Sequence, residues 1–334
     1  MQKFKCVGAR PLGAAAVALA IGLVTVGPLA APAAAAQKTA SASVSNRTLQ
    51  VTGTNGHDVV ALQADRTSAL VSFGHPTEVH RFNLADFDAI NVSLGNGNDQ
   101  FTEQSAVLSN KALTVDGGNG NDTIQTGDGN DAIFGGNGND RVDAGRGNDS
   151  VFLGNGEDFF VWNPGEGSDF VDGGNGDADV MQFNGANANE TMSLSANGSR
   201  AVFLRDVGSV RMDIKDLEIF NLNALGGTDN ITVGNLEGTG IRHANIDLSD
   251  GHGSPDGASD AVTVDGTDRG DRVSVNARDG QVHVSGLSPK TRITGSDTHD
   301  HLQVDTGGGN DKVSVDPNVS ALIGVGVDLG SGQV

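Results

Sequence analysis

The chain has 334 residues, with 42 acidic against 21 basic side chains and a formal net charge of −21. A surface this acidic argues against nucleic acid and anionic membranes as partners and favours the binding of cations. With 49 Gly, 13 Phe, one Trp and no Tyr, the chain has little material for a large globular core, which leaves a fold with a thin core or disorder.

Residues 1–36 have the pattern of a secretory signal peptide. Lys3, Lys5 and Arg10 precede an apolar, alanine-rich stretch at 12–29, and small residues at 31–36 offer cleavage sites before Gln37. We therefore expect a secreted, extracellular protein that crosses the membrane through a general secretory pore. Cleavage would remove the single cysteine and so exclude disulfides, and no later stretch is apolar enough to span a membrane.

Residues 37–116 are predicted to form the first coils of a β-solenoid. Short segments with apolar side chains at every second position are separated by Gly, Asn and Asp, as expected for strands joined by tight turns. One segment of this region, LGNGNDQFT at 94–102, follows a pattern that becomes regular further along the chain, and it places a carboxylate at Asp99.

Five consecutive nine-residue repeats run from Gly117 to Val161. They read GGNGNDTIQ, TGDGNDAIF, GGNGNDRVD, AGRGNDSVF and LGNGEDFFV, with Gly at positions two and four, a carboxylate at six and an apolar residue at eight. Two imperfect copies at 164–172 and 173–181 follow them. The apolar residues of the five regular copies, each predicted to point inward from a short strand, are Ile124, Ile133, Val142, Val151 and Phe160.

The spacing within each repeat favours a calcium loop. Glycine at positions two and four allows a turn through positive φ, and a tight turn leaves backbone carbonyls pointing inward. One Asp added to these carbonyls gives a set of hard oxygen ligands, which suits Ca²⁺ rather than zinc or copper.

These repeats resemble the RTX (repeats-in-toxin) family, also called hemolysin-type calcium-binding repeats. The resemblance implies that two repeats form one turn of a parallel β-roll, and that each Ca²⁺ lies between loops two repeats apart and shares their carbonyls and Asp side chains. The predicted metal-binding residues are Asp99, Asp122, Asp128, Asp131, Asp140, Asp149, Asp158, Asp169 and Asp179, together with Gly117, Asn119, Asn121, Asn130, Asn137, Asn139 and Asn148.

The energetics predict that the roll folds only when calcium binds. Burying one Ile or Val per repeat contributes about 1.5–3 kcal/mol, whereas ordering nine residues costs about 1–2 kcal/mol each. Stacked acidic loops would also repel one another, so calcium binding would supply folding energy.

Residues 182–334 are predicted to be further solenoid coils, with 261–332 repeating 48–120. Asp58 aligns with Asp271, Asp99 with Asp311 and Asp116 with Asp328. In the weaker loops we expect Asp58, Asp88, Asp229, Asp271 and Asp300 to cap their own turns. The whole forms an all-β, right-handed parallel β-solenoid (β-helix) with signal peptide 1–36, N-terminal coils 37–116, a calcium-binding RTX β-roll at 117–181 and C-terminal coils 182–334.

The sequence favours a binding or structural role over catalysis. It contains no HExxH, GxSxG, Walker or CxxC motif, and Asp residues bound to calcium are poor proton donors or acceptors. The main alternative is a polysaccharide lyase or epimerase on a β-helix, for which Arg200, Arg205 and Arg211 would be the basic residues. An adhesive or surface-layer protein that contacts a cell-surface glycan or protein is the third interpretation.

Overall fold

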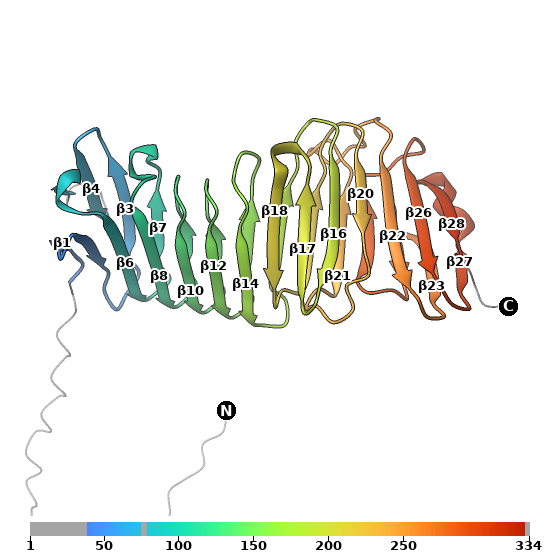
Figure 1. Cartoon of the computed structure of the whole chain (residues 1–334), viewed down its shortest axis with the longest axis horizontal. Coiled ribbons are helices and arrows are strands. Elements are labelled where there is room, and N and C mark those ends of the chain that lie inside the picture. Colours follow the sequence, from blue (N-terminus) through green and yellow to red (C-terminus); the bar gives the residue numbers. More distant parts are fainter. Residues whose placement is uncertain (1–38, 75–78, 331–334) are drawn as a thin grey trace, which may run out of the picture. The chain divides into compact units, whose positions relative to one another are not determined.

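The structure is a computed structural model that describes residues 39–74 and 79–330; the predicted signal peptide lies outside them. The described residues from 39 onward form one compact unit built from two 14-stranded sheets, sheet A and sheet B. The chain passes from one sheet to the other and back, and in the central coils each round trip adds one strand to each sheet (Figure 1).

The strands of sheet A follow the order of the chain, with one local exception at β16–β18. In spatial order they are β1 (Ser41–Ser45), β2 (Thr48–Thr52), β6 (Ala89–Asn96), β8 (Ala112–Asn119), β10 (Ala132–Asn137), β12 (Ser150–Asn155), β14 (Phe170–Asn175), β18 (Val210–Lys215), β17 (Arg200–Arg205), β16 (Thr191–Asn197), β20 (Asn230–Val233), β22 (Ala261–Thr267), β26 (His301–Gly307) and β28 (Gly324–Asp328).

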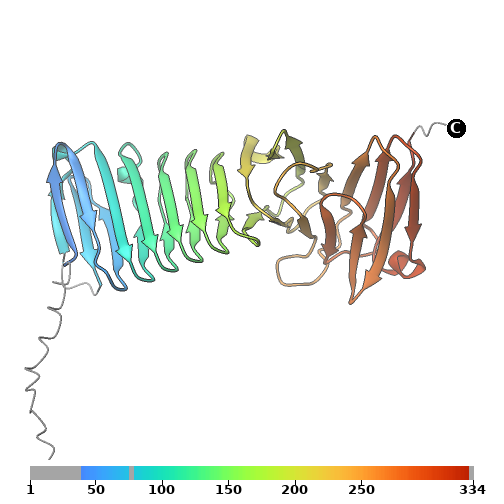
Figure 2. The same cartoon turned by 90° about the horizontal axis from the view of Figure 1, so that it is seen from below.

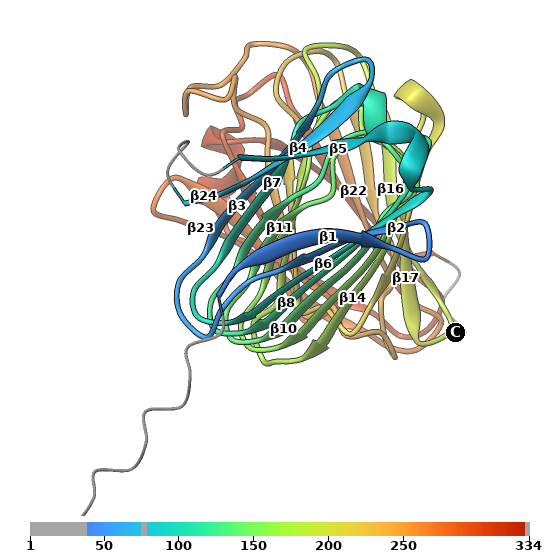
Figure 3. The same ribbon diagram turned by 90° about the vertical axis from the view of Figure 1, so that its left-hand side faces the viewer.

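Sheet B faces sheet A, as the view from the β1 end shows (Figure 3). Its strands in spatial order are β5 (Val79–Asn83), β4 (Ser68–Phe73), β3 (Val59–Ala64), β7 (Gln100–Glu103), β9 (Thr123–Gln125), β11 (Arg141–Asp143), β13 (Phe159–Trp162), β15 (Val180–Asn184), β19 (Ile219–Asn223), β21 (His243–Asp247), β25 (Lys290–Thr294), β24 (Gln281–Ser285), β23 (Arg272–Arg278) and β27 (Lys312–Val315). Short 3₁₀ helices occur at Leu84–Asp86, Ala106–Leu108, Val207–Ser209 and Pro317–Ala321.

The register of the central strands confirms that two nonapeptides make one coil. Ile133 on β10 pairs in parallel with Val151 on β12, and Val142 on β11 pairs with Phe160 on β13. Both partners lie two repeats further along the chain, and Figure 2 shows these coils as an evenly spaced series. The all-β parallel solenoid expected from the repeats is therefore the fold of this chain.

The core is a thin layer between the two sheets. The eighth residue of every array repeat points into it, and these five side chains are at most 1% exposed: Ile124, Ile133, Val142, Val151 and Phe160. Beyond the array, the core is filled by a chain of stacked rings. Trp162 stacks on Phe183 at 4.1 Å between ring centroids, and Phe203 and Phe220 continue the series at 4.4 and 4.9 Å.

The structure departs from a purely parallel solenoid at the antiparallel pair β1–β2 and at three antiparallel meanders, β3–β4–β5, β16–β17–β18 and β23–β24–β25. Two of the meanders turn through two-residue loops, Gly198-Ser199 and Asp279-Gly280, where Gly198, Asp279 and Gly280 have φ values of 68°, 53° and 73°. Glycine at the first loop position and Asp-Gly are both typical of two-residue hairpins, and these local signals override the solenoid pattern.

The strand order after β2 is the same as that after β22, and only the 3₁₀ helix Leu84–Asp86, between β5 and β6, has no counterpart in the second segment. Each strand is followed by a meander, two parallel strands, a 3₁₀ helix and a last parallel strand, namely β3–β8 in the first case and β23–β28 in the second. The loop contacts are repeated as well, because the backbone N–H of Asp58 donates to Asp99 at 2.8 Å, and that of Asp271 donates to Asp311 at 2.8 Å.

Candidate metal site

Two columns of aspartates run along the two edges where the chain crosses between the sheets. The first column consists of Asp99, Asp122, Asp140, Asp158 and Asp179, and it follows the strands of sheet A. The second column consists of Asp131, Asp149 and Asp169, and it precedes the strands of sheet A. In each column the backbone N–H of one Asp donates to Oδ1 of the next Asp, at 2.7–2.9 Å.

The other carboxylate oxygen of every column member is buried and has no hydrogen-bond partner. This holds for Oδ2 of Asp99, Asp122, Asp131, Asp140, Asp149, Asp158, Asp169 and Asp179, whose side chains belong to residues at most 4% exposed. A buried carboxylate oxygen without a donor is costly, and a native protein satisfies it with a proton, a water molecule or a cation. These oxygens therefore fit a metal ligand set.

Burial changes the proton affinity of these carboxyl groups. Desolvation raises the pKa of Asp140 to about 7 and that of Asp149 to about 8, and the charges of neighbouring column members add to both shifts. Hydrogen bonds from backbone N–H groups act in the opposite direction but are outweighed. A cation between the carboxylates would remove this penalty.

Glycines at the first position of the loops let backbone carbonyls approach the free carboxylate oxygens. A methyl group on Gly117 would lie 2.5 Å from Oδ2 of Asp122 and 2.5 Å from the carbonyl oxygen of Gly135. A methyl group on Gly135 would lie 2.6 Å from Oδ2 of Asp140 and 2.4 Å from the carbonyl oxygen of Leu153. At Gly117 and Gly135 a side chain would therefore fill the space in which the carboxylate and the carbonyl from the next coil approach each other.

Backbone oxygens have to complete the coordination. Within residues 39–74 and 79–330, no three His, Cys, Asp or Glu side chains converge as a metal cluster. A site built from one or two carboxylates and several carbonyls suits Ca²⁺, which takes six to eight oxygen ligands.

The predicted Asn residues are used to connect neighbouring coils. The amides of Asn96, Asn119, Asn137, Asn155 and Asn175 form a ladder, each donating to the preceding Asn at 2.7–2.9 Å from Asn119 onward. A second set accepts from the backbone of the next coil at 2.8–3.1 Å, and its members are Asn121, Asn130, Asn139 and Asn148. Their side chains therefore hold the loops in register, which leaves only their carbonyls to face a metal.

Sequence reasoning missed two glutamates beside the second column, the buried Glu103 and the half-buried Glu166. Glu103 is 2% exposed, and burial raises its pKa to about 7; burial also raises the pKa of Glu166, which accepts from the Asn163 backbone, to about 8. Both line a cavity of about 360 Å³ together with Asp128 and Arg146. Neither glutamate stands at position six of a repeat, so the pattern carried no signal for them.

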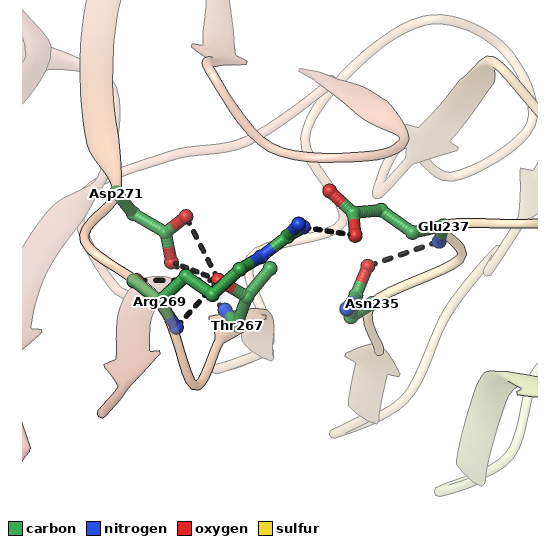
Figure 4. A network of polar contacts seen from close by, with 5 residues as sticks. All are labelled: Asn235, Glu237, Thr267, Arg269 and Asp271. Atoms are coloured by element: carbon green, nitrogen blue, oxygen red, sulfur yellow. Dashed lines mark hydrogen bonds and ion pairs between the residues drawn. The ribbon is translucent and has the colours of Figure 1, made fainter. Parts of the chain in front are cut away.

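Most of the weaker loops behave as predicted. Asp58, Asp271 and Asp300 accept from backbone N–H groups of their own turns at 2.6, 2.8 and 2.7 Å. Figure 4 shows the loop around Asp271, where Thr267 donates to the carboxylate, while Arg269 extends away to form an ion pair with Glu237.

Asp88 and Asp229 differ from the prediction. Asp88 forms an exposed ion pair with Arg47 and does not cap its own turn. Asp229 accepts from the backbone N–H of Glu190 in the preceding coil at 2.8 Å.

A comparison with protein-family models places the array in a known family. Residues 116–151 and 125–160 match the RTX calcium-binding nonapeptide repeat. No curated protein matches the sequence. RTX nonapeptide repeats bind Ca²⁺. The match covers five of the eight column members, Asp122, Asp131, Asp140, Asp149 and Asp158, whereas Asp99, Asp169 and Asp179 lie outside it.

Proposed function

We propose that this RTX-type repeat protein is secreted, folds when Ca²⁺ binds to its aspartate columns, and serves a structural or adhesive role at a cell surface. Calcium binding itself follows from the repeats. The observation that supports coupled folding is the row of buried carboxylate oxygens without hydrogen-bond partners. Ionised, they would repel one another along each column; bound to calcium, they become ligands that hold adjacent coils together.

The proposed ligands are the free Oδ2 atoms of the first and second columns and the carbonyls of the loop glycines and asparagines. Each ion would lie between two loops one coil apart, because Gly117 brings Oδ2 of its own loop near a carbonyl of the next coil. The side chain of Asp128 lines the neighbouring cavity and is open to solvent on that side, so its carboxylate would contribute from the surface.

The proposal of secretion rests on the sequence of residues 1–36, which lie outside the described part of the chain. Within the described part, no helix is long and apolar enough to cross a membrane. Low calcium inside the cell would keep the chain unfolded for export, and higher calcium outside would fold it. Mass spectrometry of exported protein should find an N-terminus near Gln37, and an intact Met1 would contradict this route.

A structural role is favoured over the lyase or epimerase alternative by the partners of the three arginines. Arg205 is buried in an ion pair with Glu190, and Arg200 pairs with Asp213 at 2.7 Å while lying 4.6 Å from the ring centre of Phe170. Arg211 pairs with the same Asp213 at 3.6 Å. Arg200 thus joins β17 to β18, Arg211 pairs within β18, and Arg205 pairs with the residue that precedes β16. All three arginines are engaged with carboxylates of the chain, which argues against a cluster of free bases for an acidic sugar.

The experiment that tests the proposal is a calcium titration of the mature protein. Far-UV circular dichroism should show a largely disordered chain in chelator and β-structure at millimolar calcium. Trp162, which is fully buried, should shift its fluorescence to shorter wavelength in the same transition. The expected dissociation constant is about 10⁻⁴–10⁻³ M, as for extracellular calcium modules. Identical spectra in chelator and calcium would contradict coupled folding.

A further inference from the structure

A third column of acids lies in the C-terminal coils, outside the segment that matches the repeat family. Its members are Glu190, Asp229, Asp260 and Asp300. The backbone N–H of each donates to the next carboxylate at 2.8, 2.9 and 3.0 Å, as in the two array columns. All four residues are at most 4% exposed.

At the two ends of the third column, Glu190 and Asp300, both carboxylate oxygens have partners within the protein. Glu190 uses one oxygen in its ion pair with Arg205 and the other as acceptor from the backbone N–H of Ala186 at 2.9 Å. Asp300 accepts from the backbone N–H of Asp297 at 2.7 Å with its second oxygen. These two carboxylates therefore have no free buried oxygen to offer to a ligand.

The two middle members of the third column, Asp229 and Asp260, each have one carboxylate oxygen without a partner. Oδ2 of Asp229, in a residue that is 0% exposed, has no hydrogen-bond partner, and neither does Oδ2 of Asp260 in a residue that is 1% exposed. Asp256 lies between the two loops, because its carboxylate accepts from the backbone N–H of Gly227 at 3.1 Å and from that of Ala258 at 2.9 Å. Asp256 therefore links the two loops through their backbone, while Asp229 and Asp260 supply the two free carboxylate oxygens. The nearby Arg205 is already paired with Glu190.

The loop 224–229 also has the backbone of an array loop. Four of the five array loops have positive φ at both positions two and four, for example 102° at Gly118 and 120° at Gly120, and the exception is Gly127. The matching positions of loop 224–229 are Leu225 and Gly227, with φ values of 69° and 132°. A leucine in the left-handed region is strained by about 1–2 kcal/mol. Loop 224–229 adopts this conformation although position two is Leu225 rather than a glycine, which would adopt it without strain.

We propose that loops 224–229 and 255–260 bind one divalent cation of the Ca²⁺ class between the carboxylates of Asp229 and Asp260. Carboxylates and backbone carbonyls are hard oxygen ligands, so calcium is the expected occupant rather than a softer transition metal. The site is separate from the array and goes beyond the function proposed above. It would fasten the coil that follows the β16–β18 meander to the next coil, where the nonapeptide pattern is lost.

The test counts bound calcium in the full mature protein. Native mass spectrometry with CaCl₂ should show one ion fewer in Asp229→Asn and in Asp260→Asn than in the wild type. Asp279→Asn changes an exposed turn carboxylate, 82% accessible, and should retain the full number. Circular dichroism in calcium checks that each variant is folded. An unchanged ion count in folded Asp229→Asn and Asp260→Asn would mean that these two acids are protonated rather than metal-bound, and the proposal would be wrong.

A measurement on the unmodified protein covers the case in which the variants do not fold. Crystals soaked in TbCl₃ should show an anomalous peak next to Oδ2 of Asp229 as well as peaks along the array. Array peaks without a peak at Asp229 would overturn the third-column site and leave the proposed function intact. A peak at Asp229 without array peaks would contradict the proposed array ligands instead.

Discussion

The backbone N–H of Asp140 donates to Oδ1 of Asp158, 18 residues further along the chain, at 2.7 Å, while Oδ2 of both residues is buried without a partner. One oxygen of each carboxylate thus fixes the register of the coils, and the other is left for a ligand. Neutralising one Asp should therefore weaken both calcium binding and the stacking of neighbouring coils.

Array aspartates should therefore be needed for calcium binding. We expect Asp131→Ala and Asp140→Ala each to lower calcium affinity and the cooperativity of the transition, because each substitution removes a ligand and a contact between coils. The measurement is a calcium titration followed by Trp162 fluorescence. Asp88→Ala is the control, since Asp88 lies in an exposed ion pair with Arg47. Equal effects from all three substitutions would show that the array is not where calcium binds.

Low pH should stabilise the folded state of the calcium-free protein. Burial raises the pKa of Asp140 to about 7 and that of Asp149 to about 8, from an ordinary value of 3.8. The calcium-free fold therefore binds more protons than the unfolded chain, and its stability is lost as pH rises from about 4 towards 8. In chelator, circular dichroism should show more β-structure at pH 5 than at pH 7.5. More structure at pH 7.5 than at pH 5 would contradict this prediction.

With calcium bound, the dependence on pH should reverse. The ion requires ionised carboxylates, so protons compete with it and calcium affinity should fall as pH decreases from 7.5 to 5. Isothermal titration at the two pH values measures the change, and proton release on binding should be detectable from its dependence on buffer ionisation enthalpy.

The close contact between glycines of successive coils should be intolerant of a side chain. A methyl group on Gly154, at φ 115°, would lie 2.1 Å from the carbonyl oxygen of Gly136, whereas one on Gly280, at φ 73°, would have no atom within 4 Å. Gly280→Ala should cost only the backbone strain of about 1–2 kcal/mol. Gly154→Ala should cost clearly more. Urea unfolding in saturating calcium compares the two, and equal midpoints would exclude the predicted clash.

The ion pair between Arg205 and Glu190 should be structural. Arg205→Met would leave a buried carboxylate without its partner and should destabilise the fold by about 3–5 kcal/mol. Arg81→Met, which breaks an exposed pair with Asp65, should change the stability far less, because solvent screens such a pair. The double variant Glu190→Met/Arg205→Met should recover much of the loss. If the purified protein cleaved an acidic polysaccharide, and Arg211→Ala abolished this without loss of stability, the lyase alternative would replace the structural role.

The sequence alone determined the architecture of the array and its metal. A nine-residue period with glycine at two and four, Asp at six and an apolar residue at eight predicts the turn, the strand and the inward side chain, because each depends on residues close together in the chain. It also predicted calcium, since the loops contain only oxygen ligands. The sequence also predicted that 261–332 repeats 48–120, and the same order of strands occurs in both segments.

Only the tertiary structure decided which acids outside the array are open to a ligand. Asp229 and Asp300 look alike in sequence, each at the end of a weak loop, yet Oδ2 of Asp300 is capped by its own turn while Oδ2 of Asp229 is free. Glu190 is closed by Arg205, which reaches it only because the β16–β17 hairpin folds back. A carboxylate's partner in a solenoid comes from the next coil, some 18 to 40 residues away. The local pattern does not encode that distance once insertions break the period.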